Sequence, residues 1–365
     1  MIAYAPAAPN FVGRMSSAIG AAIDGIALRT ARAVIDRTVM PTPETADAIR
    51  VQARFYRQPE LVAEPRRFFP FADESPPVPK VVVQPCRPRV RGSTRARLAF
   101  PSPYRPFNPA FAAEHAARVE NHWVYAEMWR HADRPARGAI VLLHGFGMGR
   151  PGFDAIALMA PAFFATGLDV ALLTLPFHGK RGARSGRFSG QLFASPDVAR
   201  LNESMGQAAH DVIAFVAWLR STGAPVVGVL GLSLGGYVAA LLAGLVGDLA
   251  FVVPVVAPVC FGDLAHRFMA SSGRFRARPE AVLDRDELRA AYRVHSPLAH
   301  PVRVPRERLL IVAGRGDRIV PAEHTQWLAE RWGQPRTAWF SGSHMAPFGR
   351  PGMRADIRRF LDDVL

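Results

Sequence analysis

The stretch Val226–Val238 constrains this chain more than any other. It reads Val-Val-Gly-Val-Leu-Gly-Leu-Ser-Leu-Gly-Gly-Tyr-Val, a short apolar run followed at once by a segment of helical character. This pattern predicts a strand, a sharp turn and a helix, with Ser233 at the turn. A turn of this kind leaves little room two residues before and two residues after the serine, and both places hold glycine, Gly231 and Gly235. The sequence therefore predicts that the Ser233 hydroxyl projects from the end of a strand.

Strand and helix patterns alternate along the chain from about Ala96. The first two predicted strands are antiparallel and cover Arg97–Phe100 and Trp123–Trp129. Continuous apolar runs and helical patterns then alternate, which indicates an α/β fold with a mostly parallel central sheet and helices on both faces. The later predicted strands are Ala139–Leu143, Val170–Leu175, Val226–Leu230, Phe251–Val256, Leu309–Ala313 and Thr337–Phe340; the predicted helices are Asp154–Thr166, Asn202–Thr222, Glu323–Trp332 and Met353–Leu365.

Residues 1–94 are expected to form an N-terminal extension. Met15–Val39 has the pattern of an amphipathic helix that packs on the main domain, with its isoleucines inward and Asp24 on its polar face. A short helix is predicted near Ala46–Tyr56, and residues 57–94, rich in Pro and Arg, are expected to be an extended linker. No pattern in the extension indicates a role for it.

Residues 95–365 are expected to form the main domain, which carries one long insertion. Residues 258–308 separate two predicted core strands and contain polar helices around Asp284–Arg293. An insertion of this size at this place is interpreted as a cap over a binding site.

The net charge of +15 raises the question of a nucleic-acid partner. All but two of the 45 basic residues are arginine, and they are spread evenly along the chain without a basic tail. This distribution is typical of the codon bias of a GC-rich genome, so no nucleic-acid partner is expected. The sequence does not indicate an oligomeric state.

Other features bear on the compartment. The apolar stretch Leu241–Phe261 is interrupted by Asp248 and by two prolines, which predicts a buried helix end, a turn and a strand in place of a membrane span. The N-terminus lacks the pattern of a secretory signal. The two cysteines, Cys86 and Cys260, are far apart and fit a reducing compartment. We expect a cytoplasmic protein without an integral membrane span, and peripheral membrane contact stays open.

Two residues after later strands are candidates to activate Ser233. A serine hydroxyl becomes a good nucleophile when an imidazole takes its proton and a carboxylate orients that imidazole. In a sheet of this kind the partners follow later strands in the order acid, then histidine. Asp317, shortly after the predicted strand Leu309–Ala313, is the predicted acid, and Asp263 is its rival. His344, shortly after the last predicted strand, is the predicted base.

Two backbone amides are candidates to stabilise an oxyanion. Leu234 follows the serine at a helix N-terminus, where amides point towards negative charge. Phe146 lies in a glycine-rich loop after the first parallel strand, and its amide is the predicted second donor. His144, at the start of the same loop, is expected to be structural.

A competing motif occupies the same loop. Gly147, Gly149 and Gly152 match the Gly-x-Gly-x-x-Gly fingerprint of dinucleotide sites. However, Pro151 lies inside the motif, and no acidic residue ends the next strand. A nicotinamide oxidoreductase is therefore disfavoured, and no cofactor or metal is expected.

Taken together, these motifs resemble those of the α/β-hydrolase superfamily: His-Gly-Phe-Gly from His144, Gly-Leu-Ser-Leu-Gly-Gly from Gly231, Gly-Arg-Gly-Asp-Arg-Ile-Val-Pro from Gly314 and Gly-Ser-His from Gly342. The resemblance implies the α/β-hydrolase fold over about residues 95–365. It also implies a nucleophile, acid, base and two oxyanion amides at Ser233, Asp317, His344, Phe146 and Leu234. Residues 175–181, the helix after them and the N-terminal extension are similar to abhydrolase domain-containing protein eighteen and to dienelactone-hydrolase-like esterases.

The resulting hypothesis is a serine hydrolase that cleaves a small-molecule carboxylic ester through an acyl-enzyme intermediate. An acyltransferase, a thioesterase or a peptidase would use the same site and stays open. A protein of another class, a non-catalytic hydrolase-fold binding protein, is disfavoured because a binding scaffold does not need all three groups.

Overall fold

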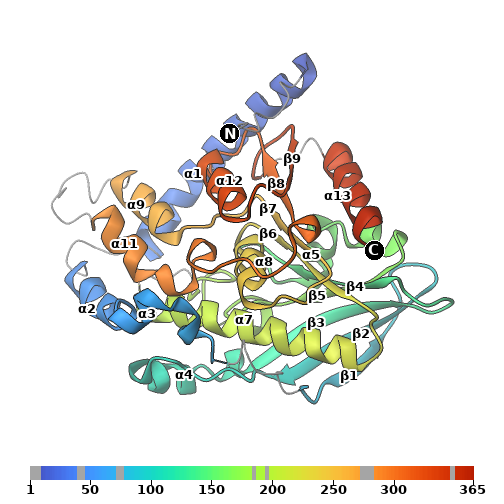
Figure 1. The fold of residues 1–365 in the computed structure, drawn as a ribbon, viewed down its shortest axis with the longest axis horizontal. Coiled ribbons are helices and arrows are strands. Elements are labelled where there is room, and N and C mark those ends of the chain that lie inside the picture. Colours follow the sequence, from blue (N-terminus) through green and yellow to red (C-terminus); the bar gives the residue numbers. More distant parts are fainter. Residues whose placement is uncertain are drawn as a thin grey trace.

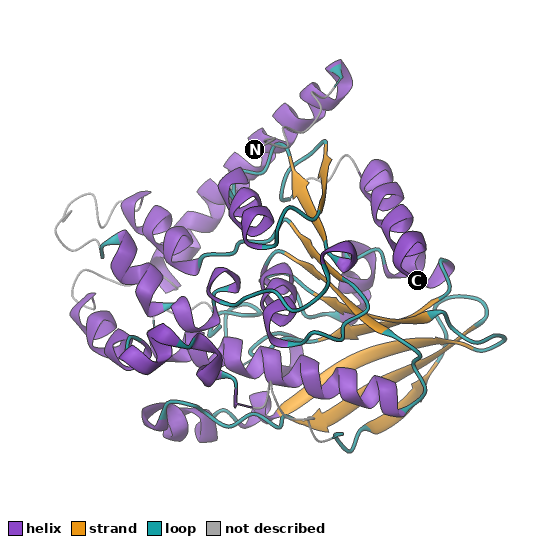
Figure 2. Cartoon of the chain, viewed as in Figure 1, coloured by secondary structure: helices purple, strands orange, loops and turns teal. Residues whose placement is uncertain are grey.

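The computed structural model describes residues 10–38, 46–70, 78–182, 186–193, 197–271, 283–345 and 350–365. Within these ranges the chain forms one central sheet with helices on both sides (Figures 1 and 2). The N-terminal helix α1 (Phe11–Thr38) lies against the loops that contain Arg318 and His344, and one of its ends projects from the body (Figure 1). Helix α12 spans Ala322–Arg331.

The sheet has nine strands in the spatial order β1-β2-β3-β5-β4-β6-β7-β8-β9. The first strands pair antiparallel as far as β3 with β5, and all pairs from β5 to β9 are parallel. The predicted α/β fold with a mostly parallel sheet is confirmed. The strands are β1 Val82–Cys86, β2 Ser93–Pro101, β3 Trp123–His131, β4 Gly138–Leu143, β5 Leu168–Leu173, β6 Val227–Leu232, β7 Val252–Val255, β8 Leu310–Gly314 and β9 Arg336–Phe340.

Two apolar cores lie on the two faces of the sheet. Along β4, Val141 and Leu143 belong to the core that α7 and α8 cover, whereas Ile140 and Leu142 belong to the core that α5, α6 and α13 cover. This division follows from the alternation of side chains along a strand, which buries a continuous apolar run on both sides. The helices are α2 Ala46–Tyr56, α3 Pro59–Ala63, α4 Ala112–Ala117, α5 Pro151–Ala157, α6 Ala160–Ala165, α7 Val198–Ser221, α8 Leu234–Leu245, α9 Phe261–Ser271, α11 Arg285–Ala291 and α13 Arg350–Val364.

One predicted helix is divided in two. The helix expected over Asp154–Thr166 is interrupted at Met159, which has a left-handed φ of 55° and separates α5 from α6. Pro161 accounts for the break, because a proline inside a continuous helix removes a backbone hydrogen bond and collides with the carbonyl four residues earlier. The apolar stretch Leu241–Phe261 contains the end of α8, a turn and β7, all as expected.

The linker predicted over residues 57–94 is wrong for most of its described part. It contains α3, a 3-10 helix at Pro65–Phe68 and the edge strand β1, and β2 begins at Ser93. Phe68 and Phe69 are 1% and 0% exposed, so the segment contributes to the main core. Because proline and arginine dominate the composition of the segment, its sequence pattern does not indicate that a few large apolar residues pack into the core. Residues 71–77 lie outside the described part.

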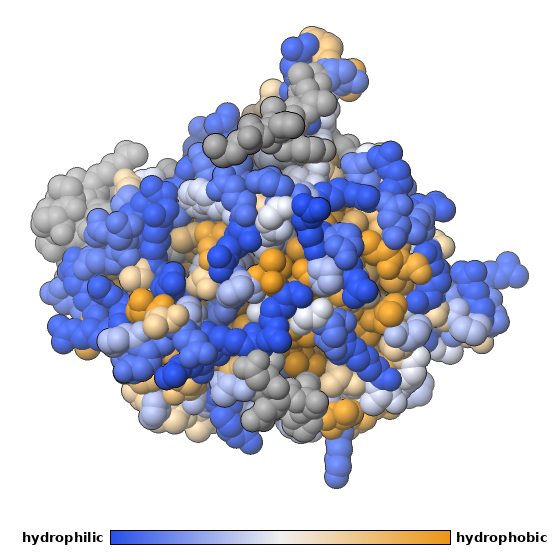
Figure 3. All heavy atoms as spheres, viewed as in Figure 1, coloured by the Kyte–Doolittle hydropathy of each residue, from blue (hydrophilic) through white to orange (hydrophobic). Residues whose placement is uncertain are grey.

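The N-terminal helix exists, but its orientation differs from the prediction. Its isoleucines face solvent: Ile19, Ile23 and Ile26 are 49%, 36% and 57% exposed. Asp24, expected on a polar face, is fully buried instead. The projecting end of the helix shows both apolar and hydrophilic residues on the surface in Figure 3. Val34 and Ile35 lie outside the residues whose side chains are described.

The insertion at 258–308 contains α9 and α11, with residues 272–282 outside the described part. Asp284 begins α11 with a capping box, in which its side chain accepts from the amide of Glu287 and the Glu287 side chain accepts in return. The two helices pack on each other, and α11 also contacts α2. That this segment caps a binding site stays a prediction.

A buried ion pair joins α7 to the loop after β5. The Arg181 and Asp211 side chains are both fully buried and lie 2.7 Å apart. Arg181 also donates to the carbonyl oxygens of Thr174 and Asn121, and Asp211 accepts from the Ser102 hydroxyl at 2.6 Å. These bonds compensate for much of the cost of removing two charges from water.

We expect Asp211→Ala to lower the free energy of unfolding by about 3–5 kcal/mol, because it leaves the Arg181 charge buried without its partner. Urea unfolding of the full chain measures this. The matched surface variant Asp362→Ala breaks the half-exposed pair with Arg137 and is expected to cost less than about 1 kcal/mol. An equal loss of unfolding free energy in the two variants would show that the buried pair stabilises the fold no more than the surface pair does.

Candidate active site

Ser233 lies at the tip of a strained turn between β6 and α8. Its backbone has φ 53° and ψ −110°, a conformation that non-glycine residues rarely adopt. The Ser233 amide donates to the Val255 carbonyl oxygen of β7 at 2.8 Å, and its carbonyl accepts from the Tyr237 amide at 2.9 Å. The neighbouring strand and the first helical turn therefore hold the serine in this conformation.

The glycines that flank the serine are required by close backbone approach. A Cβ atom on Gly231 would overlap the carbonyl of Gly235, and one on Gly235 would overlap the carbonyl of Leu143 in β4. Any side chain at either place would push α8 away from the sheet. The turn thus has the geometry that the glycine spacing predicts.

His344 bridges Ser233 and Asp317. Its Nε2 atom lies 2.9 Å from the Ser233 Oγ, and its Nδ1 atom lies 2.8 Å from the Asp317 Oδ2. The second Asp317 oxygen accepts from the amides of Ile319 and Val320 at 2.9 and 2.8 Å. These two bonds hold the carboxylate in place, so that its other oxygen accepts the Nδ1 proton of His344.

Both partners of the serine are shielded from solvent. The side chains of His344 and Asp317 are 9% and 5% exposed. Asp317 and His344 follow β8 and β9, and Ser233 follows β6, so parallel strands deliver all three to one edge of the sheet.

Asp263, the rival acid, has other partners. It lies in α9, is 4% exposed, and forms ion pairs with Arg285 and with Arg289, the latter at 3.0 Å. Burial opposes its ionisation, but the hydrogen bonds from the two arginines outweigh burial and lower the pKa of Asp263. Its charge stabilises the packing of α9 on α11, and Asp317 is the carboxylate in contact with His344.

The two predicted oxyanion amides belong to the serine turn and to a separate turn near it. Leu234 is the first residue of α8, so its amide has no acceptor within the helix. Phe146 lies in a tight turn closed by a bond from the Met148 amide to the Gly145 carbonyl at 3.3 Å. This turn comes close to Ser233, since a Cβ on Gly145 would lie 3.6 Å from the Ser233 Cβ.

His144 anchors that turn. It is 1% exposed, its Nδ1 atom bonds the Gly145 carbonyl oxygen at 2.8 Å, and its Nε2 atom accepts from the Leu175 amide at 3.1 Å. The Leu175 bond requires a lone pair on Nε2, which fixes the neutral tautomer. Burial lowers the pKa of His144 to about 4, so it stays neutral at physiological pH. His144 is a structural residue that joins the ends of β4 and β5.

Three other histidines in the later half of the chain are also buried in structural contacts. His295 bonds the Tyr237 hydroxyl at 2.7 Å, His300 the Val294 carbonyl oxygen at 2.9 Å, and His324 the Val259 amide at 3.1 Å. Burial lowers the pKa of each, to about 3 for His295 and about 4 for the other two.

The sequence interpretation missed one residue of this site. Asp24 of α1 accepts hydrogen bonds from the amides of Arg318 and His344, next to both partners of Ser233. No local motif marks it, because its role depends on a contact between residues 320 positions apart.

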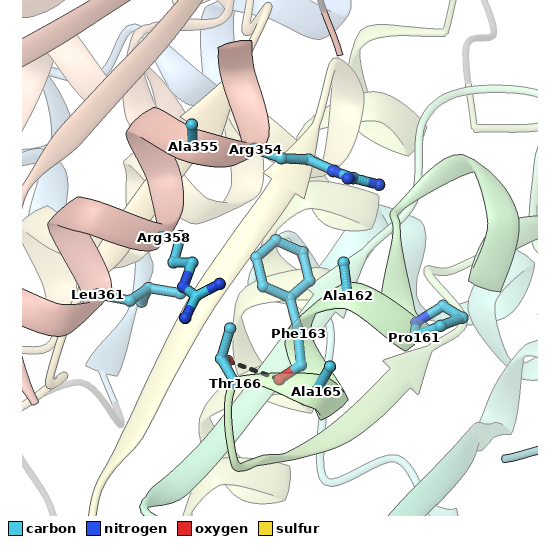
Figure 4. Close-up of a pocket in the computed structure, with 9 residues that line it drawn as sticks. All are labelled: Pro161, Ala162, Phe163, Ala165, Thr166, Arg354, Ala355, Arg358 and Leu361. Carbon is cyan, nitrogen blue, oxygen red and sulfur yellow. Dashed lines mark hydrogen bonds between the residues drawn. The ribbon is translucent and has the colours of Figure 1, made fainter. Parts of the chain in front are cut away.

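A hollow on the described part of the molecule is lined by residues outside these loops. It has a volume of about 530 Å³ and lies between α6 and α13 (Figure 4). Phe163, Ala162 and Leu361 line it together with the side chains of Arg354 and Arg358. None of its lining residues belongs to the loops that carry Ser233, Asp317 or His344, so it is not part of the candidate active site.

One glycine of the fingerprint packs closely between two loops. A Cβ on Gly149 would lie 2.9 Å from the Gly179 amide nitrogen, so this glycine serves close packing between two loops. Among the described residues, no group of three His, Cys, Asp or Glu side chains is arranged to hold a metal ion.

Comparison of the chain with known proteins identifies its relatives. The model of the serine hydrolase (FSH1) family matches residues 195–355, the part that contains Ser233, Asp317 and His344. The uncharacterized protein Rv2627c of Mycobacterium tuberculosis (strain ATCC 25618 / H37Rv) is 31% identical over 319 residues, which cover 85% of this chain and 72% of that protein. The chain belongs to the same family as this mycobacterial protein. This chain is a serine hydrolase.

Solved structures show the fold of this hydrolase. An acetyl xylan esterase from Paenibacillus sp. R4 superposes with a TM-score of 0.60 at 12% identity, covering 84% of this chain and 95% of the other. Acetyl xylan esterase 1 from Thermoanaerobacterium sp. JW/SL YS485 gives 0.57 at 14% identity, covering 81% and 92%. The α/β-hydrolase fold is thereby confirmed. The narrower resemblance to abhydrolase domain-containing protein eighteen or to dienelactone-hydrolase-like esterases stays a prediction.

Proposed function

We propose that this serine hydrolase cleaves carboxylic esters with Ser233 as nucleophile, His344 as base and Asp317 as the carboxylate that orients His344. The observation that carries the proposal is the continuous chain of two hydrogen bonds, 2.9 and 2.8 Å long, from Ser233 through His344 to Asp317. The amides of Phe146 and Leu234 are proposed as the oxyanion donors.

The reaction has two halves. In the first, the Ser233 Oγ attacks the ester carbonyl carbon while His344 Nε2 takes the hydroxyl proton, and the two amides stabilise the negative oxygen of the tetrahedral intermediate. The intermediate expels the alcohol, which receives the proton from His344. In the second half, His344 removes a proton from water, the hydroxide attacks the acyl-enzyme, and the acid leaves as Ser233 regains its proton.

The ester class rests on two supporting features. The solved structures that share the fold with a TM-score above 0.5 include two named as acetyl xylan esterases, although at 12% and 14% identity they do not define the substrate of this chain. At the proposed oxyanion turn, the Phe146 ring is 37% exposed and packs edge-on against Phe188, which offers an apolar surface to an acyl or alcohol group. An acyltransferase, thioesterase or peptidase would share the acyl-enzyme.

Replacing Ser233 tests the nucleophile. We expect the full chain to react with a fluorophosphonate probe and to hydrolyse short p-nitrophenyl esters, and Ser233→Ala to lose both, with a fall in kcat of at least about 10⁴-fold. Ser221→Ala, at an exposed serine on α7, is the matched control and should behave like wild type. Persistent labelling of Ser233→Ala would refute the assignment, and faster product formation with an added alcohol or amine acceptor would favour a transferase.

Replacing the two candidate acids tests the orienting carboxylate. Asp317→Asn keeps the size of the side chain but favours the wrong tautomer of His344, so kcat is expected to fall about 10⁴-fold. Asp263→Asn disturbs the contacts of Asp263 with Arg285 and Arg289, none of which involves His344, and is expected to keep kcat within about threefold of wild type. Stopped assays with p-nitrophenyl acetate measure both, and the reverse ranking would make Asp263 the acid.

We further infer that the enzyme acts in the cytoplasm on a small-molecule ester. The support is that Cys86 and Cys260 are both free, as in a reducing compartment. One feature favours membrane association instead. Among the described helices, Phe11–Arg29 is long and apolar enough to cross a membrane, and only 17% of its most apolar stretch is buried. Fractionation of cells that produce the full chain should recover the enzyme with the cytosol, and recovery with membranes in high salt would contradict this.

A further inference from the structure

Asp24 of α1 is a fully buried carboxylate that binds both loops flanking the candidate site. Its Oδ1 atom accepts from the Ser343 hydroxyl at 2.8 Å and from the Met345 amide at 2.9 Å. Its Oδ2 atom accepts from the amides of Arg318 and His344, both at 3.0 Å. All four donors are neutral groups, and three of them are backbone amides.

These donors lie next to the groups that activate Ser233. The Arg318 amide directly follows Asp317, and the His344 amide belongs to the proposed base itself. The Ser343 and Met345 donors precede and follow the base in the chain. One side chain from the N-terminal extension thus fixes the backbone on both sides of His344 and immediately after Asp317.

The helix that carries Asp24 fits these loops closely. A Cβ on Gly20, one turn before Asp24, would lie 2.9 Å from the Ser343 Cβ and 3.0 Å from its amide nitrogen. A Cβ on Gly316 would overlap the Ser17 carbonyl of α1. The missing side chains allow α1 to approach until Asp24 reaches its donors, which accounts for an orientation that leaves the isoleucines exposed.

The two loops also contact each other. The Gly316 amide donates to the Gly342 carbonyl oxygen at 2.7 Å, and the Arg315 amide to the Phe340 carbonyl oxygen at 3.1 Å. These bonds align the beginnings of the loops, near the ends of β8 and β9. Beyond them the chain leaves the sheet, and it is there that Asp24 supplies acceptors for the amides around Asp317 and His344.

We propose that Asp24 is a positioning residue of the active site, and that α1 completes the site by holding the loops of Asp317 and His344 in register with Ser233. This inference rests on the proposed function of those three residues. Asp24 does not touch the reacting atoms; it acts through the backbone of His344 and Arg318. A displacement of about 1 Å in such a group can lower the rate about 10²-fold.

Two replacements at position 24 test the role. Asp24→Ala removes all four acceptor contacts, and we expect kcat for a p-nitrophenyl ester to fall about 10²-fold while KM changes less than about threefold, because the loops of Asp317 and His344 shift but the acyl-binding surface remains. Asp24→Asn retains one carbonyl oxygen but turns an amide group towards amide donors, so its kcat should lie between those of Asp24→Ala and wild type. The rate of fluorophosphonate labelling of Ser233 should fall in the same order.

A matched pair on the same helix separates positioning from helix stability. Gly20→Ala and Gly25→Ala both replace glycine by a better helix former. The Gly20 replacement collides with Ser343, whereas a Cβ at Gly25 meets nothing within 4 Å. We expect Gly20→Ala to lower kcat at least about tenfold and Gly25→Ala to match wild type, with thermal unfolding of both measured on the full chain.

The outcomes distinguish this inference from the proposed function. If wild type neither labels nor hydrolyses esters, the proposed function fails. If wild type is active, Ser233→Ala is inactive and Asp24→Ala keeps the wild-type kcat, the positioning role is wrong and the proposed function stands. If Asp24→Ala does not fold, the glycine pair decides: equal kcat for Gly20→Ala and Gly25→Ala overturns the inference, and a loss confined to Gly20→Ala supports it.

Discussion

The close contact between the serine turn and β4 is the constraint on which the rest of the site depends. A Cβ atom on Gly231 or Gly235 would overlap a backbone carbonyl. Helix α8 can therefore start close to the sheet only because both positions are glycine. The strained conformation of Ser233, with φ 53°, is maintained by the bond of its amide to β7 and by the first bond of α8.

Much of the fold and the contacts of Ser233 could be predicted because their signals are local. A strand, two glycines and a helix leave a recognisable pattern within thirteen residues, and Asp317 and His344 each follow a short apolar strand closely. Parallel strands then bring these separate loops to one edge without further information. The strand ends were therefore enough to favour Asp317 and His344, although they left Asp263 as a rival acid.

The contribution of the N-terminal extension could not be predicted in this way. The isoleucines of α1 suggested a helix that buries its apolar side, yet the helix docks through Gly20 and Asp24 and exposes Ile19 and Ile26. The reason is that the partner surface consists of backbone amides and Ser343, which need a close approach and an acceptor. Periodicity reports which residues share a face, but it cannot report the chemistry of the surface that the face meets.

The same distinction applies to the residues of the site. Ser233 is held by bonds to its own sheet and helix, whereas the amides of Arg318 and His344 lie beyond the ends of β8 and β9, at the margin of the sheet. Asp24 supplies the acceptor there from 320 residues away. The conformation of the serine is thus held by local bonds, whereas the backbone of His344 bonds a residue of α1 that is distant in sequence.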